Sequence, residues 1–258
     1  HWPYAWAASS PSQVDDEYNI EKRGQLYIEA LKQVDQQVNK LLQTLQKYGY
    51  LDNSLLILLS DHGEALYLPG SRQTDPLAYQ GPGASTFADY LQRKTSTALE
   101  MSVGHGSDLL SADQYHCLLA FKIYEHNRVR TTPKIINTRV ALIDLAPTIF
   151  AFLGITNQHA DGFPLLNAIQ RNEQLPERAF IMESGMLPNQ FLTREKTREL
   201  GKKFFAIEPY NGQLHLRKDK IANLDKEKLY AIIEGDWVLA LYPDDGGYIP
   251  VTLHLNDG

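Results

Sequence analysis

The sequence predicts an α/β fold that carries a small antiparallel β-subdomain at its C-terminal end. An apolar stripe at helical spacing runs through residues 21–48, and five consecutive apolar residues follow at 55–59. A helix that leads directly into a buried strand is typical of half a βαβ unit. From about residue 204 onward, short apolar runs alternate with Gly, Asp and Asn, which indicates antiparallel hairpins.

Composition narrows the class of protein. The 258 residues, 43% of them hydrophobic, suit one large α/β domain or two small ones. A net charge of -6 argues against a general nucleic-acid binder. The single cysteine, Cys117, excludes an internal disulfide and a Cys-rich zinc site. No apolar run approaches the roughly 20 residues of a membrane span. We expect an α/β core over residues 1–200 and the antiparallel subdomain over 201–258.

The first half of the chain predicts a helix, a strand, a long loop and a second strand. The helix covers residues 21–48, and the strand at 55–59 is expected to be buried on both faces. Residues 67–102 are rich in Pro and Gly and read as a long excursion with one short helix at 86–93. An apolar run at 115–124 predicts the second buried strand, with His116 expected to pack in the core.

The second half continues with a helix at 139–153, in which Pro147 is expected to cause an offset or a kink. A short strand is predicted at 179–182. Asp245-Gly246-Gly247 is a strong hairpin signal. The strands of the subdomain are expected at 204–207, 213–217, 230–233, 237–242 and 248–255.

Two stretches carry residues suited to chemistry. Asp61 and His62 directly follow the first strand, where ligands bind in open α/β sheets. A carboxylate and an imidazole are good ligands for zinc or manganese, although Asp-His-Gly is also an ordinary loop sequence. His105 stands between two glycines, as a ligand or substrate-binding histidine would need, but a simple turn explains the same pattern.

Several segments, in this order, resemble the sulfatase family of the alkaline phosphatase-like superfamily. That family's "DNT…SDHGE" signature is similar to the segment that runs from Asp52-Asn53-Ser54 through Ser60-Asp61-His62-Gly63-Glu64. Asp161-Gly162-Phe163-Pro164-Leu165 is similar to "DGxSL", with Pro164 where Ser is usual. The other resembling segments are His1-Trp2-Pro3-Tyr4 (His-x-Pro-Tyr), residues 27–35, Gly104-His105-Gly106, residues 140–155 ("DIAPTLLDLLGI") and residues 253–257.

The resemblance implies part of a three-layer α/β/α sandwich and metal-dependent chemistry on sulfate or phosphate esters. Asp61 and His62 would hold a divalent metal ion, which could be Ca, Mn, Zn or Mg. His105 would act in catalysis, binding the substrate's anionic group or a second metal, and His1 would face the same group. Lys94 is a candidate for the lysine that some sulfatases place near the sulfate. Glu64 either orients His62 or is a solvated carboxylate.

The resemblance leaves three functions open. The family's nucleophile lies upstream of the His-x-Pro-Tyr segment, so we expect this sequence to lack a complete site. The first function is a sulfatase-like hydrolase of small-molecule, glycan or lipid esters. The second is a membrane-anchored phosphoethanolamine or phosphoglycerol transferase, attached through an upstream segment. The third is a catalytically inactive binding domain. The family favours the periplasm or the outside of the cell.

Overall fold

The structure is a computed structural model that describes residues 20–66, 84–94, 105–106, 108–156, 159–186, 194–226 and 228–255. The chain forms two compact units, and each consists of two separate chain segments. The first unit combines His1–Leu66 with Cys117–Arg178, and the second combines Tyr67–His116 with Ala179–Gly258. Among the described residues, no helix has the length and apolar character needed to cross a bilayer.

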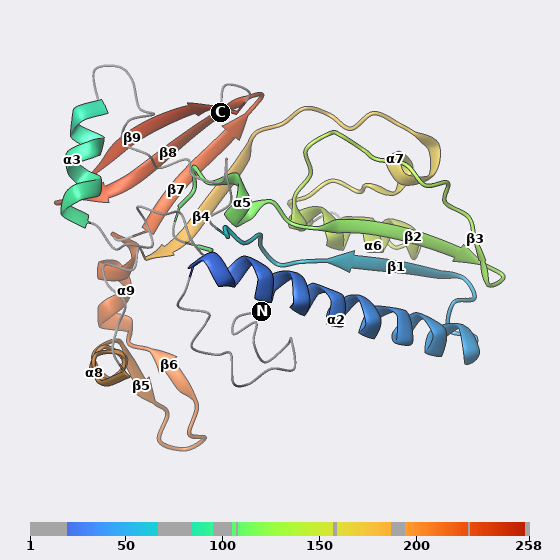
Figure 1. Ribbon diagram of the computed structural model, residues 1–258, viewed down its shortest axis with the longest axis horizontal. Helices are drawn as coiled ribbons and strands as arrows, with labels where there is room; N and C mark the ends of the chain where they lie inside the picture. The colour runs from blue at the N-terminus through green and yellow to red at the C-terminus, as the bar shows by residue number, and fades with distance from the viewer. Residues whose placement is uncertain are drawn as a thin grey trace. The chain divides into compact units, whose positions relative to one another are not determined.

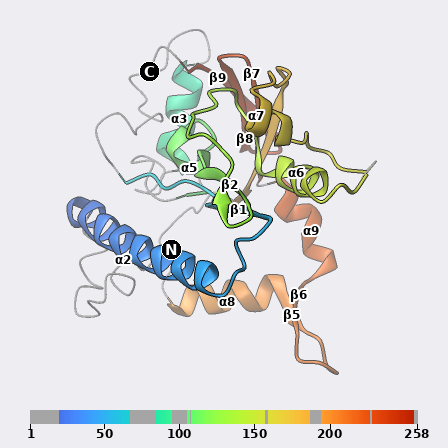
Figure 2. The same cartoon turned by 90° about the vertical axis from the view of Figure 1, so that its right-hand side faces the viewer.

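The first unit is built on a small antiparallel sheet with the strand order β1-β2-β3. Helices α6 and α7 lie on one side of this sheet and α2 runs along the other (Figures 1 and 2). Side chains of α7, such as Leu166 and Ile169, pack against Ile123 of β2 and Leu55 of β1. The elements are α2 (Ile20–Lys47), β1 (Ser54–Leu59), β2 (Leu119–Glu125), β3 (Arg128–Val129), the 3₁₀ helix η3 (Leu142–Asp144), α6 (Leu145–Phe152) and α7 (Leu166–Arg171).

The burial expected for the first strand is wrong. β1 lies within one residue of its predicted bounds, but Leu58 and Leu59 are each 42% exposed. Within the described part of the chain, β1 is the edge strand of its sheet and pairs only with β2, in antiparallel register from Ser54↔Tyr124 to Leu59↔Leu119. The expected parallel βαβ pairing is therefore absent from the described residues. The stripe of α2 is buried only in part, since Ala30 is 6% exposed whereas Val34 is 47% and Leu41 54% exposed.

The connection around α6 is held by one buried carboxylate, that of Asp144, whose side chain is fully buried. Its oxygens accept hydrogen bonds from the backbone N–H groups of Ala141 (2.9 Å) and Phe163 (2.8 Å), and from the Arg178 guanidinium. The Thr148 hydroxyl donates to the Asp144 carbonyl and accepts from the Leu165 N–H. This network fixes the loop before α7 against the start of α6.

The local geometry of the same region explains why Pro147 and Gly162 occupy their positions. Pro147 causes no kink, because it is the third residue of α6, where the missing N–H has no partner to lose. The helix expected at 139–153 instead begins as η3 and continues as α6. Gly162 is required sterically, because a Cβ there would lie 2.3 Å from the carbonyl oxygen of Ile143.

The second unit contains a four-stranded antiparallel sheet of order β4-β7-β8-β9. Its core is formed by Val238, Ala240 and Tyr242 of β8 together with Phe87 and Tyr90 of α3, and these side chains are buried. The elements are α3 (Ala84–Lys94), α5 (Ala112–Tyr115), β4 (Phe180–Met186), α8 (Arg194–Phe204), β5 (Phe205–Ile207), β6 (Leu214–Leu216), α9 (Lys218–Asp225), β7 (Lys228–Glu234), β8 (Trp237–Asp244) and β9 (Gly247–His254).

The strands and the hairpin predicted after residue 204 are confirmed. Asp244 pairs with Gly247, and the two loop residues Asp245 and Gly246 have φ angles of 36° and 89°. Positive φ at both loop positions is the geometry of the tight turn that an Asp-Gly pair favours. His116 is exposed rather than packed in the core, because the chain leaves α5 before the strand begins at Leu119. The division at residue 200 stays a prediction.

Candidate functional site

The loop that carries Asp61 and His62 begins where β1 ends. Hydrogen bonding to the segment that leads into β2 continues one residue beyond β1. The Ser60 N–H donates to the Leu118 carbonyl at 3.0 Å, and the Leu118 N–H donates to the Ser60 hydroxyl oxygen at 2.8 Å. The Ser60 side chain thus replaces a backbone acceptor, and the following residues are free to leave the sheet from a fixed point.

Asp61 and His62 form a close carboxylate–imidazole pair. The backbone N–H of His62 donates to Asp61 Oδ1 at 3.2 Å, and the ring nitrogen His62 Nε2 lies 3.6 Å from the same oxygen. His62 Nδ1 lies 2.6 Å from the carbonyl oxygen of Gly63. Because a carbonyl can only accept, Nδ1 carries a proton, and in the neutral ring Nε2 is the nitrogen that has the lone pair. The side chains are 81% exposed for Asp61 and 31% for His62.

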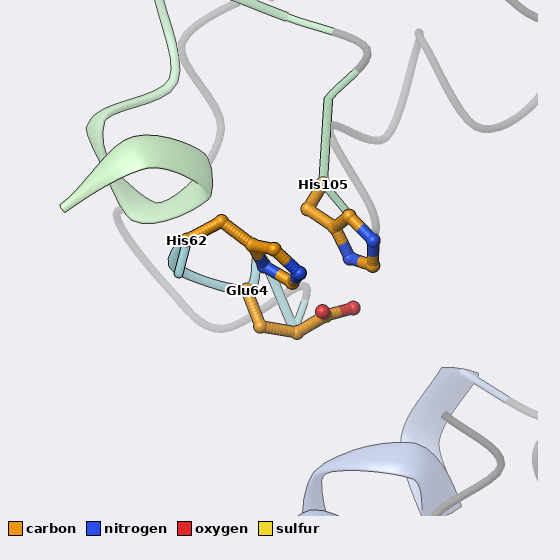
Figure 3. A group of neighbouring side chains, drawn as sticks. All are labelled: His62, Glu64 and His105. Carbon is orange, nitrogen blue, oxygen red and sulfur yellow. The ribbon is translucent and has the colours of Figure 1, made fainter. Parts of the chain in front are cut away.

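Glu64 adds a second carboxylate to the loop. A carboxylate oxygen of Glu64 lies within 4.8 Å of a ring nitrogen of His62. Figure 3 shows both side chains leaving the loop in the same direction. Sequence reasoning gave Glu64 no more than an orienting role. The signal that could have found it is the spacing, since a carboxylate two residues after a ligand histidine in a turn can reach the same point.

Cys117 lies beside this loop. Its thiol donates to the Asp61 carbonyl oxygen at 3.5 Å. Burial raises the pKa of the Cys117 thiol, and the negative charge of Asp61 raises it further. The raised pKa favours the thiol form of Cys117 over the thiolate. The sequence did not indicate its contact with Asp61, because the two residues are 56 positions apart.

The second unit carries two further predicted site residues, Lys94 and His105, and it holds the exposed His105 on an anchored loop. The Ser184 hydroxyl of β4 donates to the Gly106 carbonyl. Asp108 is buried, and its Oδ1 accepts from the Tyr242 hydroxyl of β8 at 2.6 Å and from the Leu110 N–H at 3.0 Å. Ser184, Asp108 and Tyr242 did not stand out in the sequence, because no local motif links them to His105.

Two predicted residues have no described side chain. Lys94 is the last residue of α3, and only its backbone belongs to the described residues. His1 lies outside the described residues, as do Ser107 and most of the predicted long excursion. Their expected roles stay predictions.

The described helices and antiparallel sheets define a mixed α/β protein. The family model named Sulfatase matches residues 1–155, which is more than half of the chain. The chain therefore belongs to the sulfatase family, and the resemblance that the motifs indicated is confirmed.

Among solved structures, the chain is similar to a phosphonate monoester hydrolase from Silicibacter pomeroyi. The TM-score is 0.56 at 14% sequence identity, and the match covers 92% of this chain and 35% of that chain. This likeness confirms the fold class, and the chain spans about a third of the length of that hydrolase. No curated protein matches the sequence.

Proposed function

We propose that this chain is part of a metal-dependent hydrolase of sulfate or phosphate esters, in which Asp61 and His62 hold a divalent cation. The observation that carries the proposal is the 3.6 Å distance between Asp61 Oδ1 and His62 Nε2. Two ligand atoms bound to one tetrahedral ion at about 2.1 Å lie about 3.4 Å apart, so small side-chain movements suffice. Glu64 is placed to supply a third ligand or a hydrogen-bond acceptor.

The mixed donor set favours zinc or manganese among the four candidate metals. Carboxylate oxygens suit all four ions, whereas an imidazole nitrogen suits zinc or manganese better than calcium or magnesium. When bound, such an ion lowers the pKa of a coordinated hydroxyl nucleophile and neutralises charge on the transferring group. The Nδ1–H bond to the Gly63 carbonyl keeps the His62 ring oriented with Nε2 toward that position.

The remaining roles rest on the family resemblance. We propose that His105 binds the anionic group of the ester or protonates the leaving alcohol, and that His1 faces the same group. Lys94 would add positive charge near the sulfate or phosphate. The structural neighbour is a phosphonate monoester hydrolase, which favours phosphorus-containing esters as the first substrates to try. We propose a small-molecule, glycan or lipid ester as substrate, and a periplasmic or extracellular location.

Metal binding is testable without any turnover. Isothermal titration of the 258-residue protein with Mn²⁺ and with Zn²⁺ should show a site, and Asp61→Ala and His62→Ala should each weaken it by at least about tenfold. Asp52→Ala is the matched control, because Asp52 is exposed in the turn before β1 and nine residues from Asp61. Equal affinity in all four proteins, or no binding by the unchanged protein, would contradict the assignment.

Activity is best tested in the longer protein that includes the residues upstream of His1. The substrates would be the 4-nitrophenyl esters of sulfate, phosphate and phenylphosphonate. His105→Ala should lower kcat by about 10²–10⁴ while metal content stays unchanged. A protein that keeps its metal but hydrolyses none of the three esters would favour the inactive binding domain or the transferase over the hydrolase.

A further inference from the structure

The β5–β6 hairpin of the second unit presents an apolar face that is exposed toward its tip and belongs to none of the hydrophobic clusters of the described residues. Phe205 pairs with Leu216 and Ile207 pairs with Leu214, so these four side chains share one face of the two-stranded ribbon. Ile207 and Leu214 are each 66% exposed, and Tyr210 in the connecting turn is 83% exposed. None of the three hydrophobic clusters of the described residues includes any of these five side chains.

The hairpin also stands apart from the larger sheet of its own unit. In both views β5 and β6 project from α8 and α9, away from the strands β4, β7, β8 and β9 (Figures 1 and 2). A ribbon of only two strands buries little of its own apolar surface and is marginal in water. The arrangement therefore favours a hairpin that gains burial from something outside this unit.

Positive charge surrounds the base of the hairpin. Residues 194–226 contain nine Lys and Arg against five Asp and Glu, whereas the whole chain has a net charge of -6. Lys202 and Lys203 directly precede the hairpin and Lys218 follows it, and all three are exposed. The described residues provide none of these three lysines with an ion-pair partner. At the tip, the single acidic residue Glu208 is 3.5 Å from His215.

We propose that the β5–β6 hairpin docks on the surface of a bilayer that contains anionic phospholipid. An exposed apolar face with lysines at the base of the hairpin matches the two layers of such a surface, acyl chains inside and phosphate groups outside. Adjacent strand residues are about 3.3 Å apart, so Ile207 and Leu214, each four residues from Lys203 or Lys218, lie up to about 13 Å beyond these lysines. That reach is sufficient for the depth of about 5–10 Å to which apolar faces enter the boundary between headgroups and acyl chains. The exposed Tyr210 ring adds apolar surface at the end of the hairpin that is farthest from the lysines.

Charge complementarity favours this occupant over a second copy of this chain. A second copy of this chain would bring a net charge of -6 but also the same local excess of lysines to a symmetric contact. A phospholipid surface offers many negative charges at one level and no steric requirement beyond flatness. This inference is independent of the proposed ester hydrolysis, because it uses none of the residues assigned to metal or substrate.

Vesicle co-sedimentation of the 258-residue protein tests the proposal. The probes are vesicles of phosphatidylcholine alone and vesicles of equal parts phosphatidylcholine and phosphatidylglycerol. The unchanged protein should sediment with the mixed vesicles and stay in solution with phosphatidylcholine alone. Ile207→Ser with Leu214→Ser should lower the partition coefficient at least about tenfold, through lost apolar burial. Lys202→Glu with Lys203→Glu should lower it by at least as much, because each basic residue contributes to attraction.

Ile181→Ser provides the matched control, because Ile181 is 83% exposed on β4 of the same unit but lies on a different sheet. This variant should sediment as the unchanged protein does, and circular dichroism should show all variants folded. Equal sedimentation of the hairpin variants and the unchanged protein would overturn the proposal. So would sedimentation velocity that shows self-association lost in the Ile207/Leu214 variant, since the face would then belong to a second copy.

Discussion

Two aspartates of the first unit show how differently a carboxylate can be used. Asp144 is fully buried, and its oxygens are occupied by two backbone N–H groups and by Arg178. The side chain of Asp61 is 81% exposed; its Oδ1 lies beside His62 of the same loop, and its backbone carbonyl accepts a hydrogen bond from the Cys117 thiol. The first carboxylate has its acceptor sites filled by the fold, whereas the second keeps the capacity to bind a ligand.

The difference separates a residue that maintains the fold from one suited to chemistry. A buried carboxylate is tolerated only when donors surround it, and removing it leaves those donors unpaired. An exposed carboxylate contributes little to folding, which leaves Asp61 available for the proposed metal site. The predictions below test this contrast, beginning with the largest expected effect.

Asp144→Ala should destabilise the protein by about 3–5 kcal/mol, because Arg178 would keep a largely buried charge without its partner. Asp61→Ala should change the free energy of unfolding by no more than about 0.5 kcal/mol. Urea denaturation of both variants, followed by circular dichroism, measures the difference. Similar losses of unfolding free energy in the two variants would contradict the different roles inferred for Asp144 and Asp61.

Saturating Mn²⁺ or Zn²⁺ should stabilise the unchanged protein, because an ion that binds only the folded chain shifts the unfolding equilibrium. At a hundredfold excess over Kd the gain is about 2.7 kcal/mol. Thermal denaturation with and without the ion should show this gain in the unchanged protein and in Asp52→Ala. It should be absent in His62→Ala, and a gain retained there would place the ion elsewhere.

Gly162→Ala should destabilise the protein by about 1–3 kcal/mol, since the new methyl group would collide with the Ile143 carbonyl and push the loop away from Asp144. Gly24→Ala is the control, because nothing lies within 4 Å of a Cβ at this position in α2. This control should be neutral or stabilising by about 0.5–1 kcal/mol. Urea denaturation of the pair gives the comparison, and equal stabilities would argue against a tight fit at Gly162.

The smallest expected effect concerns Cys117. Its raised pKa lowers the thiolate fraction at neutral pH, so alkylation by iodoacetamide should be slower than in the urea-unfolded chain. Asp61→Asn removes the lesser of the two causes and should speed alkylation only about twofold. A rate in the unchanged protein equal to that of the unfolded chain would show that neither burial nor Asp61 acts on the thiol.

Local sequence patterns were sufficient for most elements of the fold. The bounds of α2 and β1 agree with the apolar periodicity to within a residue, and the Asp245-Gly246 turn follows from its own chemistry. Pairing and burial were not predictable in the same way. β1 reads as a strand covered on both faces, but coverage depends on which other elements reach it, and an apolar run alone contains no such information.

The candidate site was only partly predictable for a related reason. Asp61 and His62 were found because they directly follow an apolar strand and belong to a family signature. The contacts of Cys117 with Asp61 and of Tyr242 with Asp108 join residues 56 and 134 positions apart. The register between distant segments creates such contacts, and periodicity within a segment does not reveal it.

The discontinuous construction of the first unit has a consequence for synthesis on the ribosome. β1 hydrogen-bonds to β2. In this pairing Leu59, the last residue of β1, lies opposite Leu119, the first residue of β2, which follows sixty residues later in the sequence. At about 5–20 residues per second, the nascent strand waits about 3–12 s for its partner to be translated. During that time residues 55–59 form an unpaired apolar segment that can join other chains. The charged residues Asp52, Asp61 and Glu64 flank it closely and act as gatekeepers against such association.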